Sequence, residues 1–100
     1  MKLVYAPRAL RDVDDILSYI QQRSAQGARS VSVAIEHTAE VCAEHPRGGT
    51  PTDEPHVYRW PLSAYRYTIY YRFDPATDVV EIVRVVHAAR LRDPGRVPDD

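Results

Sequence analysis

The chain contains few residues of several types, and each shortage argues against a class of protein. Cys42 is the only cysteine, so an intrachain disulfide cannot form, and a cysteine-based metal site is not expected. No apolar run approaches the roughly 18 residues that a membrane span needs. The N-terminal segment lacks the basic stretch and long apolar stretch of a signal peptide. We therefore expect a cytoplasmic protein without a membrane partner.

Lysine is also scarce, because Lys2 is the only one among 13 basic residues. Net charge is −1, but the charges are unevenly distributed. Residues 1–54 carry six basic and eight acidic side chains, whereas residues 55–96 carry seven basic and four acidic ones. All seven are arginines, whose planar guanidinium groups suit carboxylates and phosphates: Arg59, Arg66, Arg72, Arg84, Arg90, Arg92 and Arg96. The second half of the chain is thus the expected binding surface.

A chain of 100 residues is long enough for one domain with one modest core. A domain of this size buries only about 60–65% of the surface that its unfolded chain exposes, so we expect a thin stability margin and a partner that covers apolar surface. Residues 1–90 should form the domain. Residues 91–100 are polar and contain proline, which predicts a flexible tail.

The first half of the chain has the apolar spacing of two helices. A short strand over residues 2–5 precedes Pro7, which suits the first turn of a helix. Apolar residues then recur on one helix face: Ala9, Val13, Ile16, Leu17 and Ile20. We expect this helix to end near residues 24–27, with Gly27 as a left-handed cap. A second helix over about residues 28–44 should complete an antiparallel hairpin.

The second half alternates with a period of two, as strands do. Strands are expected over residues 56–62, 65–73 and 79–86. In the middle strand Tyr65, Tyr67 and Tyr71 should face the core, while Tyr70 lies on the arginine face. The last strand is apolar on both sides apart from Glu81 and Arg84, so both sides should be covered. Together the elements predict a two-layer α+β domain, with the hairpin packed on a mainly antiparallel four-stranded sheet.

Four segments in this order resemble the ParE/RelE toxin superfamily, over about residues 3–90. The residues that carry the likeness are Tyr5, Pro7, Ala9, Asp15-Ile16 and Tyr19-Ile20, then Pro46 and Gly49, then Tyr58-Arg59 and Tyr65–Tyr71, and finally Glu81–Arg90. The resemblance implies the RelE/ParE-like fold and a toxin neutralised by an antitoxin encoded beside it. For ParE-type members the implied target is DNA gyrase. For RelE-type members it is mRNA in the ribosomal decoding site.

The residues for RelE-type RNA cleavage are incomplete. Metal-independent cleavage needs a base, an acid and cations around the charged phosphorane. Arg59 and Arg66 match two basic positions of that family, but Pro61 stands where a lysine is expected, and no tyrosine or histidine follows Arg90. His87 is the remaining acid–base candidate, and its alternative role is to cap the last strand. The other histidines have no metal-ligand spacing, so neither a metal nor a cofactor is expected.

The favoured hypothesis is a non-catalytic toxin that inhibits gyrase by protein–protein contact and is held by a ParD-like, ribbon-helix-helix antitoxin. Operator DNA would be bound only through that antitoxin. The expected target-binding residues are Arg59, Arg66, Arg84, Arg90 and Arg92. Two alternatives remain: a ribosome-dependent mRNA endoribonuclease using Arg59, Arg66 and His87, and a degenerate toxin that acts only as a co-repressor.

Overall fold

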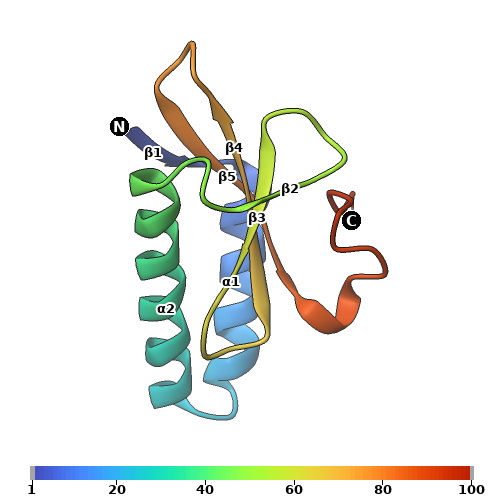
Figure 1. The fold of residues 1–100 in the computed structure, drawn as a ribbon. Helices are drawn as coiled ribbons and strands as arrows, with labels where there is room; N and C mark the ends of the chain where they lie inside the picture. The colour runs from blue at the N-terminus through green and yellow to red at the C-terminus, as the bar shows by residue number, and fades with distance from the viewer. Residues whose placement is uncertain (1, 100) are drawn as a thin grey trace.

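The computed structural model describes residues 2–99, so Met1 of the expected domain and Asp100 of the expected tail lie outside the described residues. Two helices lie against one face of a twisted sheet, and the chain end lies on the other side (Figure 1). The elements are β1 (Lys2–Tyr5), α1 (Pro7–Gln21), α2 (Ala25–Glu44), β2 (Thr50–Pro51), β3 (Val57–Pro61), β4 (Tyr67–Asp74), β5 (Val79–His87) and a final 3-10 turn, η1 (Ala88–Arg90). The predicted two-layer α+β class is confirmed.

The sheet has the strand order β1-β5-β4-β3-β2. Strands β2 to β5 pair antiparallel with their neighbours, whereas β1 pairs parallel with β5. The sheet is therefore mixed, and it has one more strand than the four expected. The additional strand, β2, is only two residues long and lies in a segment rich in Gly, Pro and Thr, a composition typical of loops. An element this short leaves no periodic pattern in a sequence.

The helical hairpin differs from the prediction at its connection. Helix α2 begins at Ala25 because the Ser24 side chain accepts a hydrogen bond from the Gly27 N–H, at 2.9 Å. Gly27 therefore lies inside the first turn of α2, and the predicted left-handed cap at this residue was wrong. A serine N-cap satisfies an otherwise unpaired helical N–H, and this stabilises the earlier start of the helix.

The core lies between the hairpin and the sheet. Its large fully buried side chains come from α2, β4 and β5 and include Ile35, Cys42, Ile69, Tyr71 and Ile82. The predicted stripe of α1 packs against this cluster, with Ala9 buried and the larger side chains partly buried. Tyr71 and Tyr67 belong to the core side as expected. Tyr65 does not: it precedes β4 and is 36% exposed, because the turn after β3 extends to residue 66.

Candidate functional site

The face of the sheet opposite the helices carries a row of polar side chains. Strand register aligns Arg59 of β3 with Tyr70 of β4, and Tyr70 with Arg84 of β5. We call these three residues the open-face row. The alternation of the strands places Tyr70 on this face, since its neighbours Ile69 and Tyr71 both lie in the core. Tyr70 is 0% exposed and Arg84 only 7% exposed, so another part of the chain must cover them.

The cover is the C-terminal tail, residues 91–99. The Tyr70 hydroxyl donates to the carbonyl of Pro94 at 2.9 Å, and Arg84 Nη1 donates to the carbonyl of Pro98 at 3.0 Å. Gly95 and Val97 bond the loop at Asp53. The predicted double cover of β5 is therefore present, with helices on one side and the tail on the other. The predicted flexibility of the tail stays a prediction.

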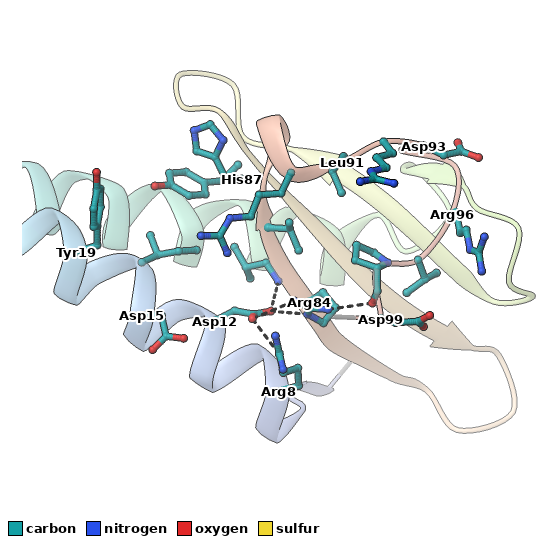
Figure 2. Close-up of a pocket in the computed structure, with 18 residues that line it drawn as sticks. Arg8, Asp12, Asp15, Tyr19, Arg84, His87, Leu91, Asp93, Arg96 and Asp99 are labelled. Carbon is teal, nitrogen blue, oxygen red and sulfur yellow. Dashed lines mark hydrogen bonds and ion pairs between the residues drawn. The ribbon is translucent and has the colours of Figure 1, made fainter.

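Arg84 is also held by helix α1. Its Nε lies 2.8 Å from Asp12 Oδ2, and its Nη2 lies 3.3 Å from Asp12 Oδ1. Asp12 additionally accepts the backbone N–H of Val85 at 3.0 Å and pairs with Arg8 at 3.3 Å. Figure 2 shows these contacts meeting at Asp12, with the tail beyond Arg84. This carboxylate thus links α1, β5 and, through Arg84, the tail.

The electrostatics of the row oppose proton transfer by Tyr70. Burial raises the pKa of its phenol; Arg59 lowers this pKa and Asp93 raises it, both to a smaller extent. The phenol therefore stays protonated near neutral pH and cannot serve as a base. Arg59 Nε is buried without a hydrogen-bond partner among the described residues.

A cleft of about 790 Å³ lies between α1, the end of β5 and the tail (Figure 2). One wall is a face of α1 with Asp12, Ile16 and Tyr19. The other wall is the tail, and Val85, Val86 and His87 of β5 also line the cleft. Its arginines are Arg8, Arg84, Arg90, Arg92 and Arg96.

The five expected target-binding arginines do not form one cluster. Arg84, Arg90 and Arg92 line the cleft, with Arg90 and Arg92 exposed and Arg84 buried. Arg66 is exposed just before β4, and its carbonyl accepts from the Ala88 N–H at 2.7 Å. Arg59 is half-buried at the other end of the open-face row.

Two residues of the nuclease alternative, His87 and Arg59, lie on opposite faces of the sheet. His87 pairs with Tyr67 across the strands, and their rings meet edge to face at 5.1 Å, on the core side of the sheet. Arg59 lies on the opposite face. The Nδ1 of His87 accepts the Ala89 N–H at 3.0 Å, so this ring caps the 3-10 turn that follows β5, close to the structural role considered from the sequence.

The sequence analysis missed Asp12 as the central acceptor. Asp12 lies outside the apolar stripe of the first helix. Its spacing of four from Arg8 predicts only an exposed helical pair, because Arg84 is 72 residues away along the chain. The tail was also missed, since carbonyl groups of Pro94 and Pro98 carry no side-chain pattern. Among residues 2–99, no cluster of metal-ligating side chains occurs, and neither described helix has the length and hydropathy of a membrane span.

Comparisons with known proteins agree with this architecture. A sequence family described as the ParE toxin of type II toxin-antitoxin system, parDE, matches residues 3–92. Toxin ParE1 of Caulobacter vibrioides is 32% identical over 81 residues, which cover 80% of this chain and 81% of that toxin.

Solved structures with 18–19% identity share the fold. The chromosomal ParDE system from P. aeruginosa superposes with a TM-score of 0.74, covering 87% of this chain and 95% of that one. The isolated E. coli RelE toxin gives 0.64, with 91% and 87% covered. The intact E. coli RelBE toxin-antitoxin complex gives 0.65, with 89% and 98% covered.

Proposed function

Because the chain belongs to the ParE toxin family of type II toxin–antitoxin systems, we propose that it inhibits DNA gyrase by protein–protein contact. A ParD-like antitoxin of the ribbon-helix-helix type neutralises it in the cytoplasm, and operator DNA is bound only through that antitoxin. The family match over residues 3–92 carries this proposal. The likeness to RelE structures concerns the fold alone.

The chemistry of the open face supports a role without catalysis. The buried guanidinium of Arg84 is paired with Asp12, and the Tyr70 hydroxyl donates to Pro94. Neither group is available to stabilise a phosphorane or to move a proton, because each already has a partner inside the molecule. The imidazole of His87 lies on the other face of the sheet from Arg59.

Exposed arginines are the proposed gyrase contacts. Arg66, Arg90 and Arg92 are exposed around one end of the sheet, where the final 3-10 turn and the tail begin. Truncating an important interface arginine costs about 2 kcal/mol or more of binding free energy. Arg59 can add a contact from the open face. Arg84 acts indirectly, by holding the tail through Pro98.

Expression without antitoxin, followed by assays of the purified protein, tests the proposal. We expect DNA damage with filamentation in cells and inhibition of gyrase supercoiling in vitro. Arg66→Ala and Arg90→Ala should relieve toxicity with little change in melting temperature, whereas Arg11→Ala on α1 is the matched control. Rapid translation arrest with cuts in ribosome-bound message would instead establish the nuclease. No effect in cells would indicate a degenerate toxin that serves as co-repressor.

A further inference from the structure

The tail, residues 91–99, covers side chains that the main core does not include. Tyr70 is 0% exposed, Val86 7% and Arg84 7%, yet none of the three belongs to the cluster between the helices and the sheet. The alternation of β4 and β5 places them on the open face instead. Without the tail, this face would present an apolar and cationic surface to a partner.

The tail is attached to the sheet through hydrogen bonds of its backbone. Its Pro94 and Pro98 carbonyls accept from the open-face row, and its Gly95 carbonyl and Val97 N–H bond Asp53 of the loop before β3. None of its side chains is buried, and most are exposed. A segment with few buried apolar contacts opens locally at a low free-energy cost, while the rest of the domain stays folded. These are the properties of a segment that can lift from the sheet as a unit.

The tail leaves one donor of the open-face row without a partner. Arg59 Nε is buried and forms no hydrogen bond with any of residues 2–99, and a buried donor without an acceptor destabilises the state that contains it. Asp93 of the tail does not supply the bond: its Oδ1 accepts the Gly95 N–H at 3.0 Å, and Figure 2 shows its carboxylate pointing away from Arg84. Carbonyl oxygens are also weaker acceptors for a guanidinium than carboxylates are. A chain with a carboxylate within reach of Arg59 would therefore bind the row better than the tail does.

We propose that the tail is an autoinhibitory strap, and that the open-face row beneath it binds an extended, carboxylate-bearing segment of the target protein. The occupant is a peptide because the strap is itself a peptide chain that fits this face, with carbonyls that accept from Tyr70 and Arg84. Its carboxylate pairs with Arg59. Asp12 holds Arg84 through contacts that do not involve the tail, so only the tail has to move. This inference rests on the proposed function, which supplies gyrase as the target.

The strap lowers the apparent affinity for the target, because only the fraction of molecules with a lifted tail can bind. Loosening one of its contacts should therefore strengthen the inhibition of gyrase. Asp53 allows this outside the row, since its carboxylate accepts the Val97 N–H at 3.3 Å. Asp53→Ala removes the acceptor, and Asp53→Asn is the matched control because its amide oxygen can still accept.

Inhibition of supercoiling by purified DNA gyrase measures the effect. We expect the half-inhibitory concentration of Asp53→Ala to lie at least about threefold below that of the wild type, as for one lost hydrogen bond, and that of Asp53→Asn to match the wild type. Unchanged or weaker inhibition by Asp53→Ala would overturn the strap and leave the proposed function standing. Equal gains for both variants would assign the effect to the lost charge and would also overturn the strap. If the wild-type protein does not inhibit gyrase, the proposed function fails, and the inference with it.

Amide hydrogen exchange of the wild-type protein tests the strap without a substitution. The tail amides, including that of Val97, should exchange at least about fivefold faster in the complex with gyrase than in the free protein, because the strap is displaced. The amides of β4, which pairs with a strand on each side, should exchange no faster. Slower or unchanged exchange of the tail in a complex that forms would overturn the inference. If a short single-stranded RNA accelerated exchange of the tail and gyrase did not, the row would bind phosphates, and the assignment to a peptide would be wrong.

Discussion

The two faces of the sheet are both covered, but by different kinds of contact. On the helix side, Ile35 and Cys42 of α2 pack with Ile69 and Ile82 of the sheet in a cluster without charged groups. On the other side, the tail uses backbone carbonyls to cover a row that contains two arginines. Apolar packing is non-directional and grows with buried area, whereas the open face depends on a few individual hydrogen bonds.

The two kinds of contact divide the molecule into a side that stabilises the fold and a side that carries the proposed binding residues. The helix side resembles the core of any small domain, and its side chains are buried away from partners. The open face and its margin hold the arginines and the tail. A face held by separate polar contacts is more sensitive to single substitutions at its buried charges than at its rim. The following predictions test that contrast, from the largest expected effect to the smallest.

The largest effect should come from Asp12→Ala. The substitution leaves the Arg84 guanidinium buried without its counter-charge and the Val85 N–H without its acceptor. Breaking one partner of a buried ion pair costs about 3–5 kcal/mol of unfolding free energy. Urea denaturation of the purified variant measures this. Arg8→Ala removes a partner of the same carboxylate that is 40% exposed, so it should cost less than about 1 kcal/mol. Similar losses for both variants would contradict the prediction.

The contrast between the faces also explains which features of the fold could be predicted from the sequence. The spacing of Ala9, Val13 and Ile16 predicted the helix face correctly, because apolar periodicity reports directly on burial. The alternation around Tyr70 placed it on the arginine face, and the structure confirms this. Periodicity failed at Tyr65, since a strand boundary has no periodic signal, and at Gly27, where the Ser24 cap decided the start of the helix.

The candidate site was less predictable than the fold. The arginine positions in the chain were clear, but their partners were not. Arg84 pairs with a carboxylate from the first helix, and Tyr70 bonds a carbonyl 24 residues later. Both contacts depend on the tertiary arrangement.

Adjacent tyrosines allow the same substitution on opposite faces. The Tyr71 hydroxyl donates to the Pro46 carbonyl and accepts from the Gly49 N–H, whereas the Tyr70 hydroxyl donates only to Pro94. Tyr71→Phe should therefore cost about 2 kcal/mol of unfolding free energy and Tyr70→Phe about 1 kcal/mol, at roughly 1 kcal/mol per hydrogen bond. Thermal melts of both variants measure the pair. A larger loss for Tyr70→Phe would show that the tail contributes more to the free energy of unfolding than the loop that contains Pro46 and Gly49.

Alkaline pH should weaken the helix side first. Burial raises the pKa of the Cys42 thiol to about 12 from its ordinary 9.0, and burial also raises the pKa of Tyr71. The folded state thus favours the neutral forms of these two groups. Their contribution to stability is constant below about pH 8 and falls as the same groups ionise in the unfolded chain above about pH 9. One pH unit above 9 corresponds to about 1.4 kcal/mol for the thiol. Urea denaturation at pH 8, 9 and 10 measures the slope, and Cys42→Ala should flatten it. If Cys42→Ala and the wild type gave identical slopes, the Cys42 thiol would not be the source of this pH dependence.

The smallest effect should come from the rim of the open face. Arg72 lies 3.4 Å from Glu54 and 4.0 Å from Glu81, and all three side chains are 39–49% exposed. Water screens such pairs and the long side chains lose rotamer entropy, so Arg72→Ala should cost less than about 0.5 kcal/mol. The Glu54→Gln variant tests one of the two pairs without shortening the side chain. Urea denaturation at 50 mM and 500 mM NaCl should give the same small difference from wild type for Arg72→Ala, within about 0.3 kcal/mol, because little electrostatic stabilisation remains to be screened. A loss above about 2 kcal/mol would mean that ion pairs at the rim stabilise the open face as strongly as the buried pair of Asp12 and Arg84, and the contrast between buried and rim charges would fail.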